Sequence, residues 1–150
     1  MRPTPLFRFG LTACLALCGA GAAMAGTDEG QVVPQVIAGD GVAVAVPSGM
    51  AVTLQEVIWN VPGPEGLTLR FRFLAPAIAE GADPDTVSAD LQHLCDSYAL
   101  PRVPEFDPRP EQIVISVAAA PVAFGETAPD VVQFFESYRI EDGACQWELF

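Results

Sequence analysis

Residues 67–74 of the chain, LTLRFRFL, alternate apolar and polar side chains with unusual regularity. The apolar set is Leu67, Leu69, Phe71 and Phe73, and the polar set is Thr68, Arg70 and Arg72. Because successive side chains of a strand point to opposite faces, this pattern predicts a strand with one buried and one wet face. Residues 51–59, AVTLQEVIW, predict a second strand, and the Pro- and Gly-rich residues 60–66 between the two predict a hairpin.

Short β-branched or aromatic runs elsewhere in the chain predict further strands. They are residues 32–37, 42–46, 112–118, 131–140 and 145–150. Pro34 restricts the first run to a sheet edge, because proline cannot donate a ladder hydrogen bond. Residues 38–41, AGDG, predict a turn between the first two runs, and Asp142-Gly143 predicts a hairpin between the last two.

One helix is predicted over residues 84–99. Asp83 is suited to cap its N-terminus and Pro84 to occupy its first turn. An apolar stripe at helical spacing follows, made of Val87, Leu91, Leu94, Cys95 and Tyr98. We expect the helix to end before Pro101 and the four prolines of residues 101–110 to form an extended loop.

Residues 1–25 have the pattern of a secretory signal peptide. Arg2 and Arg8 supply the positive region, residues 11–20 the short apolar region, and Ala23-Met24-Ala25 the small-residue cleavage box. We therefore expect cleavage after Ala25, export to the periplasm, and a single globular domain over residues 26–150.

A lipid anchor on one of the leader cysteines fits this pattern less well. Cys14 follows suitable small residues, but Arg8 lies where the apolar region of a lipoprotein signal is needed. Cys18 follows Leu17, which is too large for the position before the cut. A membrane anchor is also disfavoured, because no apolar run reaches the roughly 18 residues that cross a bilayer.

Removal of the leader leaves two cysteines, Cys95 and Cys145. In an exported chain such a pair is most simply one disulfide. It closes a loop of about 50 residues, which the chain-entropy model values at about 4 kcal/mol. Free thiols or a metal pair are the alternative, although neither cysteine lies in a CxxC motif or beside a histidine.

These elements predict an α+β domain. We expect an antiparallel sheet of five to seven strands with one main helix, residues 84–99, packed on one face. The disulfide would then tie Cys95 on the helix to Cys145 on the C-terminal strand.

The charge of the chain excludes two classes of partner. Seven arginines and no lysine stand against nineteen acidic residues, for a net charge of −12. Sequence-independent nucleic-acid binding needs a basic surface that displaces counterions from phosphates. Attraction to anionic lipid headgroups needs the same surface.

Three arginines are the candidate binding residues of the sequence. If their strands are neighbours, Arg70, Arg72 and Arg139 share one sheet face, where guanidinium groups are suited to contact an anionic carboxylate or phosphate. The alternative is ordinary cross-strand pairing with acids on neighbouring strands. The acids considered are Glu56, Glu136 and Glu148.

His93 is the only histidine, and Asp90 and Ser97 lie near it on the helical wheel. A catalytic triad is disfavoured, because triads draw their members from separate elements and need an oxyanion hole. Asp90 and His93 alone are too few ligands for a metal. We interpret the three as a solvated helix face and predict no catalytic residue.

Gly39-Asp40-Gly41 matches the opening of a thiamine diphosphate motif. That motif needs a carboxylate and a downstream asparagine on one Mg²⁺, and Asn60 lies too close along the chain. We interpret the tripeptide as a turn and predict no cofactor and no metal.

Six segments of the chain resemble a family of small exported bacterial proteins of unknown function. They are VPSG (46–49), TLQEVIW (53–59), GPEGLTLRFRFLAP (63–76), LCDSYALPR (94–102), QIVIS (112–116) and YRIEDGACQWELF (138–150). The resemblance implies an exported single domain and brings no established activity or catalytic residue. Such proteins are sometimes named acetolactate synthase, but the length, the leader and the missing cofactor machinery argue against that activity here.

The sequence favours a periplasmic binding or accessory domain without catalysis, and its ligand or protein partner stays unidentified. One alternative is a small periplasmic hydrolase that uses carboxylates. Another is an inhibitor-type interaction protein that presents residues 101–110 as a rigid loop.

Overall fold

The structure, a computed structural model, describes residues 33–149. The predicted leader and its cleavage position therefore lie outside the described residues. The strands are β1 (Gln35–Ala38), β2 (Ala43–Val44), β3 (Val52–Gly63), β4 (Gly66–Leu74), β5 (Gln112–Ala118), β6 (Gln133–Glu141) and β7 (Ala144–Glu148). The helical elements are a 3-10 turn (Pro76–Glu80), α1 (Pro84–Leu94), a π turn (Cys95–Ala99) and a second 3-10 helix (Leu100–Glu105).

The seven strands form one mixed sheet in the order β1-β3-β4-β5-β6-β7, with β2 also paired to β3. The α+β class is confirmed, but the expectation of a wholly antiparallel sheet is wrong at one place. β4 and β5 are parallel, whereas every other pair is antiparallel. The reason is that residues 75–111 contain the helix and return the chain to the edge where β4 began, as a parallel crossover requires.

Both predicted hairpins are confirmed. The β3–β4 hairpin closes with Gly63 opposite Gly66. The β6–β7 hairpin turns at Asp142 and Gly143, whose φ values of 50° and 75° match the two central residues of a tight hairpin turn.

The helix begins where the sequence predicts but ends later. Asp83 caps it by accepting a 2.9 Å hydrogen bond from the Thr86 N–H. The α, π and 3-10 segments then run on without a break from residue 84 to residue 105, so the predicted end before Pro101 is wrong. Pro101 lies in the first turn of the 3-10 segment, where its missing N–H breaks no hydrogen bond.

The predicted extended loop over residues 101–110 is therefore also wrong for residues 101–105. Val103 is buried, and the Phe106 ring lies 5.6 Å from the Trp59 ring between their centroids. The Arg102 guanidinium stacks on the Tyr98 ring and donates to the Tyr98 carbonyl. The loop on which the inhibitor interpretation depends is therefore shorter than predicted, and its residues 107–109 are exposed.

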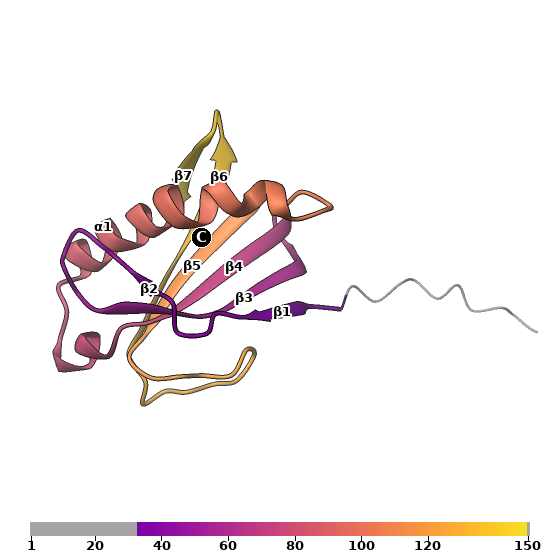
Figure 1. Ribbon diagram of the computed structural model, residues 1–150. Coiled ribbons are helices and arrows are strands. Elements are labelled where there is room, and N and C mark those ends of the chain that lie inside the picture. Colours follow the sequence, from indigo (N-terminus) through magenta and orange to yellow (C-terminus); the bar gives the residue numbers. More distant parts are fainter. Residues whose placement is uncertain (1–32, 150) are drawn as a thin grey trace, which may run out of the picture. The chain divides into compact units, whose positions relative to one another are not determined.

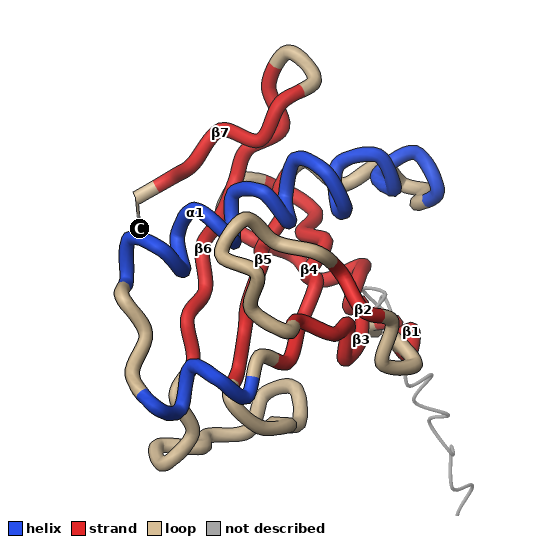
Figure 2. Tube along the Cα trace, turned by 60° about the vertical axis from the view of Figure 1, so that its left-hand side comes forward, coloured by secondary structure: helices blue, strands red, loops and turns tan. Residues whose placement is uncertain are grey.

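The core lies between the helical segment and one face of the sheet, which the helix crosses in both views (Figures 1 and 2). The predicted burial of Leu69, Phe71 and Phe73 is confirmed, since each is at most 1% exposed. The predicted wet face is wrong at Thr68, which is 0% exposed because it hydrogen-bonds Gln112 of the neighbouring strand. The Cys95–Cys145 disulfide joins the π turn to β7, as expected. No helix within residues 33–149 is long and apolar enough to cross a membrane.

The opposite face of the sheet is partly covered by the segment that connects β5 to β6, drawn in orange in Figure 1. The Val122 carbonyl of this segment accepts hydrogen bonds from the side chains of Gln55 and Arg72. Val122 itself is buried. The same face carries polar side chains toward the hairpin end of the sheet, such as Thr68, Gln112 and Arg139, and also the exposed apolar side chain of Phe135.

Candidate functional site

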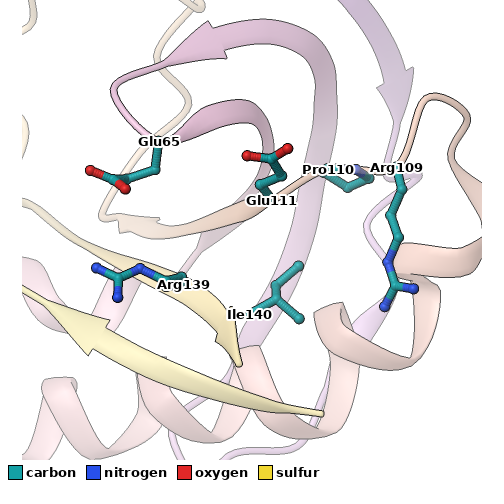
Figure 3. Close-up of a pocket in the computed structure, with 6 residues that line it drawn as sticks. All are labelled: Glu65, Arg109, Pro110, Glu111, Arg139 and Ile140. Carbon is teal, nitrogen blue, oxygen red and sulfur yellow. The ribbon is translucent and has the colours of Figure 1, made fainter. Parts of the chain in front are cut away.

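Two cavities lie at the end of the sheet where β3 turns into β4. The first, cavity A, has a volume of about 450 Å³ and is shown in Figure 3; its lining residues are Glu65, Arg109, Pro110, Glu111, Arg139 and Ile140. The second, cavity B, has a volume of about 350 Å³; its lining residues are Pro64, Glu65, Gln112, Ser137, Glu148 and Leu149. Glu65 lines both cavities, so the two adjoin at the hairpin turn.

The strand register explains why these residues meet. Thr68 of β4, Gln112 of β5 and Arg139 of β6 are direct neighbours across the sheet. Backbone hydrogen bonds extend this ladder past the start of β5, because the Glu111 N–H donates to the Leu67 carbonyl at 2.9 Å and the Glu111 carbonyl accepts from the Ile140 N–H at 3.3 Å. The segment before β5 is thereby held between β4 and β6.

Two glycines of the hairpin make room for the polar groups. A Cβ atom on Gly66 would lie 2.3 Å from Glu111 Oε2, and Gly66 has a φ of 118° that favours glycine. A Cβ on Gly63 would lie 2.2 Å from the Thr68 hydroxyl oxygen. Both contacts are closer than a real Cβ tolerates, so glycine at these positions permits the polar lining of the cavities.

Cavity A contains side chains of both charges. Figure 3 shows Glu65 and Glu111 along one side and Arg139 with Ile140 across from them, with Arg109 at one end. Arg139 donates to Glu148 and, at 3.4 Å, to Glu141, and these hydrogen bonds raise its pKa above the ordinary value. Among residues 33–149, no carboxylate forms an ion pair with Arg109.

A buried polar chain forms the inner wall of cavity B. The Thr68 hydroxyl donates to Gln112 Oε1 at 3.1 Å, and Gln112 Nε2 donates to Glu148 Oε2 at 3.1 Å. The other oxygen of Glu148 accepts from Arg139. Because Thr68 and Gln112 are buried, their hydrogen bonds hold the Glu148 carboxylate in one position.

The three arginines predicted from the sequence lie on one face of the sheet but do not meet in one site. Arg72 pairs with Glu56, and Arg139 pairs with Glu148, so the cross-strand alternative is confirmed for both. Arg70 lies under Phe124, with 5.9 Å between its guanidinium carbon and the ring centre, and burial lowers its pKa. Of the three, Arg139 alone lines a cavity.

Replacing Arg72 with alanine is expected to lower the free energy of unfolding by about 2 kcal/mol, measured by urea denaturation. The side chains of Arg72 and Glu56 are only 12% and 17% exposed. The change therefore leaves the Glu56 carboxylate buried without its cation and removes the hydrogen bond from Arg72 to the Val122 carbonyl. Arg109→Ala is the matched control with a small expected effect, because Arg109 is exposed and forms no ion pair within residues 33–149. An equal decrease in the free energy of unfolding in the two variants would contradict the stabilising role of the Arg72–Glu56 pair.

Asp90 and Ser97, the residues near His93 on the helical wheel, each hydrogen-bond a group other than the His93 imidazole. The predicted solvated position of Asp90 is wrong: Asp90 is 2% exposed and accepts hydrogen bonds from the backbone N–H and the hydroxyl of Ser48. The loop between β2 and β3 therefore covers this part of the helix. The Ser97 hydroxyl donates to the His93 carbonyl at 2.6 Å.

Asp40 and Gly41 have φ values of 51° and 65° and form a tight turn, so the turn interpretation of residues 39–41 is confirmed. Asn60 lies within β3, inside the register shift between Ile58 and Val61. Within the described chain, no three His, Cys, Asp or Glu residues are grouped as a metal site.

A second polar cluster lies between α1 and β6, and sequence patterns did not reveal it. Glu136 accepts hydrogen bonds from the Ser88 hydroxyl, at 2.6 Å, and from the Tyr138 hydroxyl. Burial, together with the adjacent Glu136 carboxylate, raises the pKa of Tyr138 far above its ordinary value. These contacts fix the helix to β6 and line neither cavity.

A family model covers most of the chain, from residue 18 to residue 150. The chain belongs to the family of unknown function DUF6497. No curated protein and no solved structure matches it. Membership in DUF6497 agrees with the predicted resemblance in one respect, namely that the family has no known function. It assigns no activity, so the cavities must be interpreted from their own chemistry.

Glu65, Arg109 and Glu111 are the cavity residues that sequence patterns missed. They lie in loops next to strand ends, where no periodicity marks them. The glycines that flank Glu65 were the available signal, because residues 63–66 combine two glycines with a charged side chain.

Proposed function

We propose that this DUF6497 protein is an exported, periplasmic binding domain that holds a small charged molecule in cavity A and does not catalyse a reaction. The observation that supports it most directly is the cavity itself. Its volume of about 450 Å³ lies within the range of about 300–1,000 Å³ typical of small-molecule sites. Its charged side chains come from the β3–β4 turn, the segment before β5, and β6.

The charges of cavity A suit a ligand that carries an anionic group. Arg109 has no ion-pair partner within residues 33–149, so its guanidinium is available for a carboxylate or phosphate. Arg139 is already bound by Glu148 and contributes a fixed positive charge to the wall. Glu65 is exposed and Glu111 lies beside it, so the cavity also accepts hydrogen-bond donors of the ligand.

Two features support export. The predicted leader over residues 1–25 has the pattern of a signal peptide. The Cys95–Cys145 disulfide is of the kind that persists in oxidising compartments and is rare in the cytosol.

Native mass spectrometry of the protein purified from the periplasm of its host tests this proposal. We expect a chain that begins at Gly26 and carries an additional mass that is lost on denaturation. In Arg109→Gln the affinity for that molecule should fall about tenfold, since one charged hydrogen bond is removed.

Arg102→Gln is the matched control, because Arg102 contacts Tyr98 and lines neither cavity. A bare chain in the spectrum, or equal retention of the added mass by the Arg109 and Arg102 variants, would contradict the binding proposal. A chain that retains residues 1–25 would contradict export.

The hydrolase alternative has one specific observation in its favour. Glu65 and Glu111 line the same cavity, and glycoside hydrolysis uses two carboxyl groups across one site. If this alternative is correct, the wild-type protein hydrolyses some members of a panel of fluorogenic glycosides, and Glu111→Gln abolishes that turnover. Hydrolysis that persists in both Glu65→Gln and Glu111→Gln would exclude these carboxylates.

A further inference from the structure

The hydroxyl of Ser137 is a buried polar group without a partner in the described part of the chain. Ser137 lies in the middle of β6, is 1% exposed, and its Oγ atom forms no hydrogen bond with any residue of the range 33–149. Buried hydroxyls are almost always paired, because an unpaired one loses its hydrogen bonds to water without replacement. An alanine at this position would avoid the free-energy cost of burying an unpaired hydroxyl. The hydroxyl is therefore explained if a molecule from outside the chain forms a hydrogen bond with it.

Ser137 lines cavity B, and the other lining residues indicate the chemistry of that partner. Glu65 and Glu148 contribute two carboxylates, and none of the six lining residues is a cation. Arg139 offsets the charge of Glu148 from outside the cavity, which leaves Glu65 as the uncompensated negative charge. An anionic ligand group is therefore disfavoured in cavity B, whereas a cationic one is attracted.

The hydrogen-bond acceptors of cavity B match a primary ammonium group. An ammonium has three N–H donors and no acceptor. Ser137 Oγ and the carboxylates of Glu65 and Glu148 are three acceptors from β6, the β3–β4 turn and β7. Pro64 and Leu149 add an apolar wall that suits the carbon atoms next to the nitrogen. A divalent ion such as Ca²⁺ needs six or more oxygen ligands, and this wall supplies too few.

We infer that cavity B is an ammonium subsite, and that the ligand of this protein is an elongated zwitterion whose ammonium and anionic groups are separated by several bonds. This inference rests on the proposed function, because Glu65 lines both cavities and a ligand with its ammonium group in cavity B can extend through cavity A to Arg109. The ammonium group binds Ser137, Glu148 and Glu65, and the anionic group binds Arg109. An unbranched ω-amino acid and a short peptide with free termini share this chemistry.

Titrations of the mature protein with butylamine, butanol and butyrate, followed by amide chemical shifts, test the subsite alone. The three probes have similar shape and differ in charge. We expect butylamine, which is an ammonium at neutral pH, to shift the amide signals of Ser137 and Gln112. Butanol and butyrate should leave these signals unchanged. Equal shifts with all three probes, or none with butylamine, would overturn the inference.

Ser137→Ala is the decisive variant. It should weaken butylamine binding about tenfold and leave the thermal midpoint unchanged or higher, because the missing hydroxyl had no partner in the chain. Glu65→Gln should weaken binding and reduce its salt dependence. The control Glu126→Gln removes an exposed charge that lines neither cavity and should change nothing. Wild-type affinity in Ser137→Ala would overturn the inference.

Arg109→Gln separates this inference from the proposed function. Butylamine has no anionic group, so its binding should be the same in Arg109→Gln as in the wild type. If Arg109→Gln weakens binding of the natural ligand but Ser137→Ala does not, the ammonium subsite is contradicted and the proposed function is supported. If Ser137→Ala weakens butylamine binding but Arg109→Gln weakens the binding of no zwitterion, the ammonium subsite is supported and the anion site in cavity A is contradicted.

A comparison of 6-aminohexanoate with trialanine, each in free and N-acetylated form, distinguishes the two sources of the ammonium group. An ω-amino acid as ligand gives binding of free 6-aminohexanoate and rejection of both peptides. A peptide terminus gives binding of free trialanine and rejection of its acetylated form. Equal binding of the acetylated forms would overturn the ammonium assignment.

Discussion

Replacing Cys145 with serine is expected to lower the midpoint of thermal unfolding by more than about 10 °C. The Cys95–Cys145 disulfide closes a loop with a sequence separation of 50 residues, and in the chain-entropy model such a crosslink contributes about 4 kcal/mol. It also joins the helical segment to β7, a five-residue strand at the edge of the sheet. The loss is therefore larger than that expected for a surface substitution.

Two hydrogen bonds reinforce the junction at Cys145. The Cys145 N–H donates to Asp96 Oδ1 at 3.1 Å, and Gln92 Nε2 donates to the Cys145 carbonyl at 3.1 Å. These contacts keep β7 near the helix after the disulfide is broken. We therefore expect the variant to fold at low temperature and to unfold earlier on heating.

Differential scanning calorimetry with and without reductant measures the effect. The double variant Cys95→Ala/Cys145→Ala is the control, because it has no thiol that can form a wrong crosslink. Reduction should bring the wild-type midpoint down to that of the double variant, whose own midpoint should not respond to reductant. A wild-type midpoint that reduction leaves unchanged would contradict the stabilising role of the disulfide.

The features that the sequence predicted are those set by local physical chemistry. The alternation of residues 67–74 assigned Leu69, Phe71 and Phe73 to the core, because side-chain direction in a strand has a period of two. Asp83 and Pro84 marked the helix start, since both relieve the unpaired N–H groups of a first turn.

The features that the sequence missed depend on contacts between distant segments. The parallel pairing of β4 with β5 is decided by how the long crossover packs, and no residue pattern records it. The continuation of the helix past Pro101 depends on the burial of Val103 and on the contact of Phe106 with Trp59. Tertiary packing thus outweighed the local tendency of the prolines to end the helix.

The candidate site divides in the same way. The pairing of Arg72 and Arg139 with acidic residues was predicted because charged side chains on a sheet face pair across neighbouring strands. Only the strand register was needed to identify the partners. The cavities require two loops, the β3–β4 turn and the segment before β5, to meet strands β5, β6 and β7, and no repeating pattern in a single sequence encodes that meeting. Ser137 illustrates the limit, because its unpartnered burial is visible only once its neighbours are placed.

Replacing Asp90 with alanine is expected to lower the free energy of unfolding by about 3 kcal/mol, the second large effect. The Asp90 carboxylate accepts the Ser48 N–H at 3.0 Å and the Ser48 hydroxyl, and the same hydroxyl oxygen accepts the Met50 N–H at 3.1 Å. Removing the carboxylate therefore leaves two donors of the loop between β2 and β3 without their partner.

The loop should respond more strongly than the rest of the fold. In Asp90→Ala, hydrogen exchange of the Ser48 and Met50 amides should accelerate before that of the core strands, because the loop loses its attachment to the helix. Asp85→Ala is the matched control, since Asp85 lies on the exposed side of the same helix. If Asp90→Ala and Asp85→Ala cost the same free energy, the carboxylate does not anchor the loop.

The double variant Ser48→Ala/Asp90→Ala separates the side-chain bond from the backbone bond. Ser48→Ala removes only the hydroxyl, so it should cost less than Asp90→Ala, which also deprives the Ser48 N–H of its acceptor. Because the two side chains bond each other, the double variant should cost less than the sum of the single changes. Strict additivity would mean that the Ser48–Asp90 contact contributes no coupling, and that burial of the helix face alone holds the loop in place.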